Sequence, residues 1–223
     1  MIKSDKMDKK KIGLSLKIAE FLKQRRFRSG LVLDLGCGIY KRPGAIGIDL
    51  YSLPGVDLIW DLTKFPYPFP SSSAKKIYLV QVLEHFKFPQ QLKILKEAAR
   101  ILKAGGILEL QVPHTYSIGS FQDPTHQAFF TFHTIDYLTS GSSGYEWYPK
   151  NKLPLVLQKR DIKVLLSYSR HMKSAVWAGL ERIPTLFMKF ILRVSPGLAD
   201  IFLRLLPFFY VDVIWILKKK RTV

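Results

Sequence analysis

Polar residues follow four successive strand-like segments of the sequence, and their side chains suit a ligand that contains a nucleoside. The first segment ends in 34-DLGCG-38, where small residues let a ligand approach the backbone closely. Asp49 ends the second segment, and its carboxylate can accept hydrogen bonds from both hydroxyls of a ribose. Asp61 and Leu62 follow the third segment and offer one polar contact and one apolar face, which suits a purine. Gln81 follows the fourth segment.

An alternation of short apolar segments and helical patterns must position these residues, and it predicts a mostly parallel sheet. The expected strands are 31–35, 45–48, 56–60, 76–80, 106–112, 162–169 and 211–217. A helix over about 90–102 leads into Gly105-Gly106, which ends it. Ligands of open α/β sheets bind beyond the carboxyl ends of the strands, so the polar residues above should meet at one edge of the sheet.

The chain is expected to form a single domain with four consecutive parts. They are a basic N-terminal helix over 1–28, a core over 29–169 with an irregular excursion over 113–150, an apolar and basic helical insertion over 170–210, and a last strand with a basic tail over 211–223. The insertion has no uninterrupted apolar run of the roughly 18–20 residues that a membrane span needs. We expect it to lie on a membrane surface, to form a dimer face, to cover a lipid-linked molecule, or to add a plain helical layer to the core.

The net charge of +18 is concentrated in the two ends of the chain. Residues 1–28 contain ten Lys or Arg and three Asp or Glu, and residues 150–223 contain fifteen and four, whereas residues 29–149 contain ten of each. Two basic end regions favour an anionic partner, which could be a membrane surface, a nucleic acid or a phosphorylated substrate. Solubility alone is the alternative explanation.

Cysteine content and the N-terminal sequence indicate the compartment. Cys37 is the one cysteine of the sequence, which excludes an internal disulfide and is consistent with a reducing environment. The N-terminal segment is basic but lacks the apolar core of a secretory signal. The sequence therefore predicts a cytoplasmic protein, with peripheral attachment at the inner face of the membrane as the alternative.

Five motifs in a fixed order resemble the class I S-adenosylmethionine-dependent methyltransferases. They are LDLGCG, GIDL, WDLTKFPYPF, KIYLVQVLEHF and RILKAGGILELQVPH, and they cover about residues 29–114. The small bacterial and archaeal type 11 enzymes, some of them associated with glycan or lipid modification, are also similar to this chain over 113–138. The resemblance implies a Rossmann-like sheet of seven mostly parallel strands whose last strand, 211–217, is antiparallel. It also implies S-adenosylmethionine as the cofactor and S-adenosylhomocysteine as the product.

The resemblance implies a set of cofactor-binding residues at the strand ends. The residues around the methionine part of the cofactor would be Asp34, Gly36, Cys37 and Gly38. Asp49 would bind the ribose hydroxyls, and Asp61 and Leu62 would flank the adenine. Gln81 would lie near the sulfonium. An acidic ribose ligand and a neutral glycine turn suit a cationic cofactor better than a pyrophosphate. Cys37 is expected to be a small filler of the turn, since no basic residue beside it would lower the pKa of its thiol.

The chain departs from the family pattern directly after the glycine turn. The third glycine of the family is replaced by Tyr40, and only residues 39–48 separate Gly38 from Asp49. The usual helix after the first strand must therefore shrink to a turn around 41–44. Tyr40 is a candidate for contact with the methionine tail or the substrate, and capping of the sheet is its alternative role.

Several acid–base groups near the predicted site are candidates for substrate contact or catalysis. Glu84 and His85 are candidates for substrate contact, with the start of a helix as their alternative role. His114, Asp123 and His126 are the candidate catalytic groups, because methyl transfer to oxygen needs a base near the hydroxyl. Their alternatives are an Asx-type turn at Asp123 and histidines that only pack. A metal site made of these three is conceivable, but their spacing matches no standard ligand pattern, so no metal is predicted.

The favoured function is O-methylation of a sugar, a glycolipid or another small hydroxylated acceptor. No Asn/Asp-Pro-Pro-Tyr/Phe sequence follows the fourth strand, which disfavours methylation of nucleobase amines. The alternatives are an RNA methyltransferase and a non-catalytic adaptor of a membrane or a complex. The expected partners are a small-molecule or lipid-linked glycan acceptor and an anionic membrane surface, with a homodimer as a further alternative.

Overall fold

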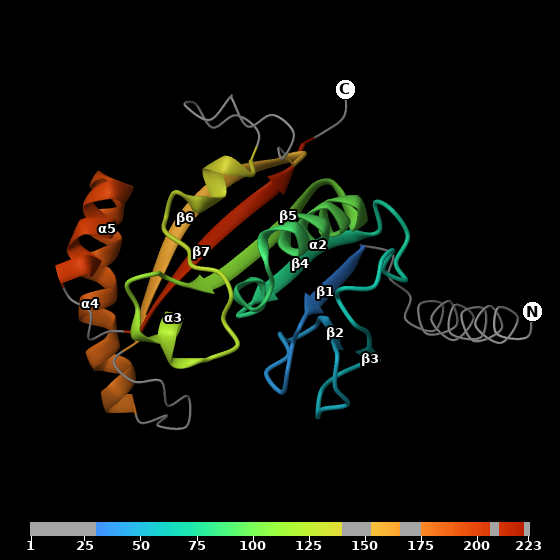
Figure 1. The fold of residues 1–223 in the computed structure, drawn as a ribbon, viewed down its shortest axis with the longest axis horizontal. Coiled ribbons are helices and arrows are strands. Elements are labelled where there is room, and N and C mark those ends of the chain that lie inside the picture. The colour runs from blue at the N-terminus through green and yellow to red at the C-terminus, as the bar shows by residue number, and fades with distance from the viewer. Residues whose placement is uncertain (1–29, 140–152, 166–174, 206–209, 221–223) are drawn as a thin grey trace, which may run out of the picture.

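Seven strands form one sheet in the order β3-β2-β1-β4-β5-β7-β6 (Figure 1). The structure is a computed structural model that describes residues 30–139, 153–165, 175–205 and 210–220. The strands are β1 Leu31–Leu35, β2 Ile46–Asp49, β3 Leu58–Ile59, β4 Ala74–Val80, β5 Leu102–Pro113, β6 Leu155–Leu165 and β7 Tyr210–Lys219.

The sheet is parallel from β3 to β5, and β7 runs antiparallel to both of its neighbours, β5 and β6. This arrangement confirms the predicted Rossmann-like sheet with an antiparallel last strand. The chain proceeds outward from β1 to β3 and then returns to place β4 on the other side of β1. The strand order therefore reverses between β1 and β4, where such sheets bind their ligands.

Apolar residues at alternate positions of the central strands form much of the core. Leu33, Leu35, Ile77, Leu79, Leu108 and Leu110 are fully buried. The residues between them, such as Val32, Tyr78 and Glu109, are only partly buried, so buried and partly exposed positions alternate along these strands.

The helices lie on both sides of the sheet and at one end of it (Figure 1). They are α2 Phe88–Ile101, α3 Ile118–Gln122, α4 Ala175–Val194 and α5 Pro196–Leu205, with short 3-10 turns η1 Leu83–His85 and η2 Thr134–Tyr137. Pro89 stands in the first turn of α2, where it needs no hydrogen-bond donor. The helix α4 packs against β6 and against α5. None of the described helices is both long and apolar enough to cross a membrane.

The structure differs from the sequence-based expectation in three details. The strand β6 begins at Leu155 rather than at 162, and β3 is reduced to two residues. The excursion after β5 is less irregular than expected, since it contains α3 and η2. The predicted N-terminal helix over 1–28 and the basic end of the tail lie outside the described residues.

A tight loop replaces the first crossover helix, as the ten-residue spacing predicted. Residues 36–45 contain turns and no helix. The backbone N–H of Arg42 donates to Asp34 Oδ2 at 2.7 Å, and that of Ala45 donates to the carbonyl of Arg42 at 3.1 Å. Lys41 Nζ lies 2.7 Å from Asp57 Oδ2, which ties the loop to the segment before β3. Hydrogen bonds thus hold this connection where helix packing would otherwise do so.

Candidate active site

The glycine turn at the end of β1 combines one crowded position with one open position. A Cβ atom at Gly36 would lie 2.5 Å from Val82 Cγ2, and the φ of Gly36 is +71°. Gly38 has a φ of +52°, and among the described residues no atom lies within 4 Å of the place where its Cβ would be. Gly36 is therefore required by packing and by its backbone conformation. Gly38 borders open space beside the strand end, where a ligand can approach the backbone.

Two carboxylates fix the turn from its two ends. Asp34 is buried, which raises the pKa of its carboxyl, while the backbone N–H and the charge of Arg42 oppose this rise. Asp49 Oδ2 accepts a hydrogen bond from the N–H of Gly38 at 2.8 Å, and its Oδ1 accepts one from Tyr51 at 3.1 Å. A carboxylate has about four acceptor positions, so the half-buried Asp49 can also accept hydrogen bonds from ligand hydroxyls.

Cys37 is inert within this turn. Its side chain is buried, and burial together with the charges of Asp34 and Asp49 raises the pKa of its thiol to about 11. The thiol is therefore protonated at neutral pH, which agrees with the interpretation of Cys37 as a filler. Tyr40, the substrate-contact candidate next to the turn, is exposed at its edge.

Asp61 and Leu62 point in different directions after β3. Asp61 Oδ1 accepts hydrogen bonds from the N–H and the hydroxyl of Thr63, which lower the pKa of the Asp61 carboxyl. Leu62 is buried in the core, and its carbonyl accepts a hydrogen bond from the Tyr67 hydroxyl at 2.9 Å. The adenine contacts that the resemblance implied for this pair remain predictions, and the apolar side chain of Leu62 packs inward.

Gln81 has a backbone conformation that is uncommon for a residue with a side chain. Its φ is +57°, and its N–H donates to the carbonyl of Gln111 at 2.8 Å. Such conformations cost energy and gather at functional sites. The bend at Gln81 turns the chain from β4 into η1, so that Glu84 and His85 stand at the carboxyl edge of the sheet.

His114 connects β5 to α5. It is fully buried, its Nε2 lies 2.8 Å from Asp200 Oδ1, and its Nδ1 accepts a hydrogen bond from the N–H of Tyr116 at 3.2 Å. Since Nδ1 acts as an acceptor, these partners assign the proton to Nε2, which donates it to Asp200. Both ring nitrogens are thus engaged in structural contacts. The catalytic role of His114 remains a prediction.

Asp123 forms the Asx-type turn considered above. Its Oδ1 accepts hydrogen bonds from the N–H of Thr125 at 2.8 Å and from its hydroxyl at 2.7 Å, and these bonds lower the pKa of the Asp123 carboxyl. Asp123, His114 and His126 do not form a cluster of potential ligands in the described part of the chain. The catalytic role of Asp123 also remains a prediction.

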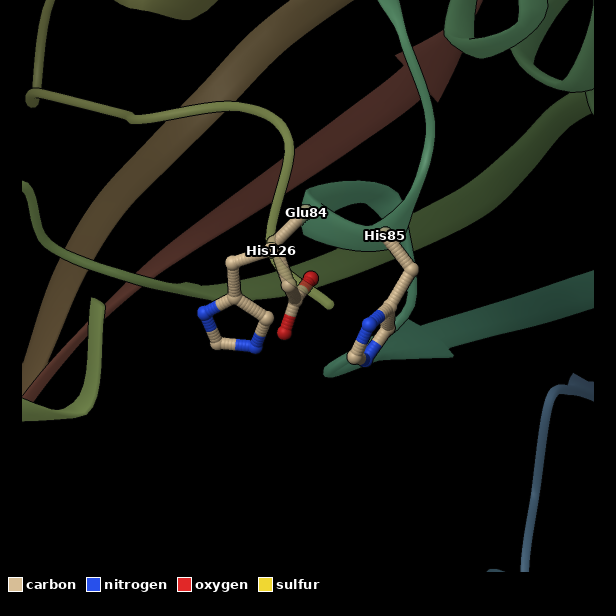
Figure 2. A group of neighbouring side chains, drawn as sticks. All are labelled: Glu84, His85 and His126. Carbon is tan, nitrogen blue, oxygen red and sulfur yellow. The ribbon is translucent and has the colours of Figure 1, made fainter. Parts of the chain in front are cut away.

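The structure instead brings His126 together with Glu84 and His85. One potential ligand atom from each side chain lies within 4.8 Å of the other two, and Figure 2 shows the Glu84 carboxylate between the two imidazole rings. The backbone N–H groups of Gln127 and Ala128 donate to the Glu84 carbonyl at 2.7 and 3.2 Å. These two bonds hold the loop of His126 against η1. We refer to Glu84, His85 and His126 as the Glu-His-His cluster.

Glu84 carries the strongest electrostatic perturbation of this cluster. Its side chain is fully buried, and neither carboxylate oxygen has a hydrogen-bond partner among the described residues. Burial, followed by the negative charges of Asp212 and Asp123, raises the pKa of the Glu84 carboxyl to about 8. The pKa of His85 is lowered by burial and by the nearby His126. Perturbed groups at a strand-end edge are the usual mark of a functional site.

The sequence matches a known family in part, and the fold matches solved structures. A family model described as "Methyltransferase domain" matches residues 53–110. A SAM-dependent methyltransferase from Archaeoglobus fulgidus is 15% identical, with a TM-score of 0.51 and with 92% of this chain and 93% of that chain covered. A SAM-dependent methyltransferase from Methanosarcina mazei is 13% identical, with a TM-score of 0.50 and coverages of 91% and 98%. A search of curated proteins gives no match.

The strand order and the glycine turn at the β1–β4 reversal define a class I S-adenosylmethionine-dependent methyltransferase fold. By this fold, and by the family match over residues 53–110, the chain is similar to methyltransferases whose cofactor is S-adenosylmethionine. The residues present fit this cofactor. Gly38 borders open space, and the Asp49 carboxylate stands directly beside it.

Proposed function

We propose that the protein transfers a methyl group from S-adenosylmethionine to a hydroxyl of a small acceptor such as a sugar or a glycolipid. The observation that carries the proposal is the shared edge of the sheet. The glycine turn with Asp49 ends β1 and β2, and the Glu-His-His cluster follows β4, the strand next to β1. The proposed cofactor-binding turn and a group of acid–base side chains therefore follow neighbouring strands at the same edge of the sheet.

The residues on this edge have distinct tasks in the proposed reaction. Asp49 accepts hydrogen bonds from the ribose hydroxyls, and Gly38 lets the cofactor lie against the backbone. The bound cofactor supplies an electrophilic methyl group. His126 is retained as a base for the acceptor hydroxyl, because its ring lies at the same edge beside Glu84. Positioning of the acceptor beside the methyl group supplies much of the rate increase in such transfers.

Calorimetric titration with S-adenosylmethionine and S-adenosylhomocysteine tests the cofactor half of the proposal. Asp49→Ala should weaken binding by about tenfold or more, since it removes a charged acceptor. The matched control is Glu109→Ala. It removes a carboxylate that pairs with Lys76 at 2.8 Å between β5 and β4, and it should leave the affinity for both compounds unaltered. The proposal fails if neither compound binds the wild type at millimolar concentration.

Transfer of a labelled methyl group to separate pools of sugars, glycolipids and RNA tests the acceptor half. Label in the sugar or glycolipid pool supports the proposal. Label only in RNA, with binding that falls steeply as salt rises, would identify an RNA methyltransferase instead. Cofactor binding with no labelled acceptor in any pool would favour the non-catalytic adaptor.

We further propose that α4 and α5 attach the protein to an anionic membrane surface. Their outward side is apolar; its exposed residues are Leu186, Phe187, Phe190, Val194, Leu198, Ile201 and Leu205. Met188, Leu192, Ala199 and Leu203 on the same helices are buried, so the exposed set is a second apolar face. Arg193 and Arg204 are exposed on these helices and can pair with anionic lipid head groups.

Flotation with vesicles distinguishes the membrane from a second copy of the chain as the occupant of this face. The wild type should float with vesicles that contain phosphatidylglycerol and should do so weakly with pure phosphatidylcholine. Phe190→Ser should reduce flotation, whereas Phe88→Ser, an equally apolar exposed residue at the start of α2, should not. A concentration-dependent dimer in light scattering, with no flotation, would reject the membrane proposal.

A further inference from the structure

Among the described residues, the Glu84 carboxyl has no regular hydrogen-bond partner, and only the nearby backbone N–H groups of Glu84 and Val82 partly offset the effect of its burial. Its two oxygens are the only buried side-chain polar atoms without a hydrogen bond among the described residues. Burial of an unpaired carboxylate costs several kcal/mol, so such groups normally pair with a cation or coordinate a metal. The structure therefore contains a buried carboxyl group without a hydrogen-bond partner among the described residues, and a bound cation could take the place of its proton.

The two histidines of the cluster are held with one ring nitrogen unprotonated. The Thr125 hydroxyl donates its hydrogen to Asp123 Oδ1 at 2.7 Å, so it must accept from His85 Nδ1, which lies 2.8 Å away. His126 Nδ1 lies 3.1 Å from the carbonyl of Ser120, an acceptor that requires a proton on this nitrogen. These partners assign the lone pair to Nε2 in both rings. Metal-binding histidines are oriented in this way, by a hydrogen bond from the nitrogen that does not bind the metal.

The cluster thus offers three ligands that converge. The ligand atoms lie within 4.8 Å of one another, on η1 and on the loop held against it by the Glu84 carbonyl (Figure 2). We propose that Glu84, His85 and His126 bind one divalent transition-metal ion, of the Zn²⁺, Mn²⁺ or Co²⁺ class. Two imidazoles and one carboxylate suit such ions, whereas Ca²⁺ and Mg²⁺ favour all-oxygen sites.

Three protein ligands leave open coordination positions, as in catalytic rather than structural metal sites. An acceptor oxygen can occupy one of these positions, which would place it at the edge shared with the cofactor turn; this role rests on the proposed methyl transfer. An ion bound in this way holds the acceptor and lowers the pKa of its hydroxyl. The Nε2 atom of His126 would then be a ligand, so His126 would no longer serve as the base.

Titration of untagged, EDTA-treated protein with Zn²⁺ and with Mn²⁺ in a calorimeter tests the site. The wild type should bind one ion per chain with micromolar or tighter affinity for at least one of the two ions. Glu84→Gln and His126→Ala should each weaken binding by about tenfold or more. The matched control is His133→Ala, since His133 pairs with Asp136 outside the cluster. The affinity of this variant for the metal ion should stay within about twofold of that of the wild type. Circular dichroism of each variant verifies that it is folded.

Two results would overturn the metal site. One is the absence of stoichiometric binding by the wild type up to about 1 mM of either ion. The other is equal affinity in the wild type and in folded Glu84→Gln and His126→Ala.

Titration of the same samples with S-adenosylhomocysteine separates this inference from the proposed function. Metal binding without cofactor binding would leave the metal site intact and reject the methyltransferase. Methyl transfer that is unchanged in EDTA would reject a role of the metal in the transfer and leave the methyltransferase intact.

Discussion

Replacement of Glu84 by glutamine should change the pH dependence of stability in the metal-free protein. Glutamine preserves the shape of the side chain and removes its charge. Glu84 faces the carboxylates of Asp212 on β7 and Asp123 in the loop, and beside it are the rings of His85 and His126. In the folded protein the pKa of Glu84 is raised from 4.5 to about 8, mainly because the carboxyl is buried.

The size and sign of the effect follow from this shift. Below pH 4.5 the carboxyl is protonated in both the folded and the unfolded states, and its ionisation costs the folded state nothing. Between pH 4.5 and about 8 the unfolded chain is ionised while the folded one keeps its proton, so stability falls as the pH rises. Each pH unit in this window corresponds to about 1.4 kcal/mol, which gives a loss of about 2–4 kcal/mol between pH 5 and pH 8. The variant should lack this loss.

Urea unfolding at pH 5, 6, 7 and 8 in the presence of EDTA measures the effect. The stability of Glu84→Gln should approach that of the wild type at pH 5 and exceed it at pH 8 by about 2–4 kcal/mol. Glu109→Gln is the control, because Glu109 pairs with Lys76 at 2.8 Å, and its difference from the wild type should be the same at each pH. Parallel curves for the wild type and Glu84→Gln would refute the buried, unpaired state of this carboxylate.

Four further experiments test other parts of the site. Gly36→Ala should destabilise the fold by about 1–3 kcal/mol in urea unfolding, because its Cβ would lie 2.5 Å from Val82 Cγ2 at a positive φ. Gly38→Ala, at an equally positive φ but in open space, should cost only about 1 kcal/mol and should instead weaken S-adenosylhomocysteine binding in calorimetry. Alkylation of Cys37 by iodoacetamide at pH 8 should be at least about 100-fold slower in the folded than in the unfolded protein, since the pKa of its thiol rises from 9.0 to about 11. Equal alkylation rates would contradict the burial of this thiol. His114→Ala should lower the free energy of unfolding by about 2–4 kcal/mol, because it removes a buried ring that joins β5 to α5.

Most of the fold could be predicted from the sequence because its signals are local. The central strands are mostly apolar, so Leu31–Leu35 and the second half of Ala74–Val80 stand out from their surroundings. The spacing between Gly38 and Asp49 leaves no room for a helix, and the structure contains none there. The start of β6 was missed because Gln158, Lys159 and Arg160 are polar in an edge strand, where one side of the backbone remains accessible.

The candidate site was predictable only where one segment contains all the relevant residues. The turn of Gly36 and Gly38 was recognised in this way. The Glu-His-His cluster was not, because His126 is separated from Glu84 by about forty residues and reaches it through backbone bonds to the Glu84 carbonyl. Only the structure shows that His114 is turned toward α5, away from the contacts of His126, and the catalytic role of each of them remains a prediction. The sequence Asp-Pro-Thr before His126 predicts a turn, but it does not predict which side chains the His126 ring will contact.

The hydrogen bond between His114 and Asp200 has a consequence for the proposed acceptor. It attaches α5 to the segment that follows the carboxyl end of β5, so the proposed membrane-binding helix lies next to this end of the sheet (Figure 1). On a bilayer, this geometry would turn the mouth of the site toward the lipid head groups. A membrane-embedded acceptor would then need only lateral diffusion, and its polar group would reach the site while its tail stays in the bilayer.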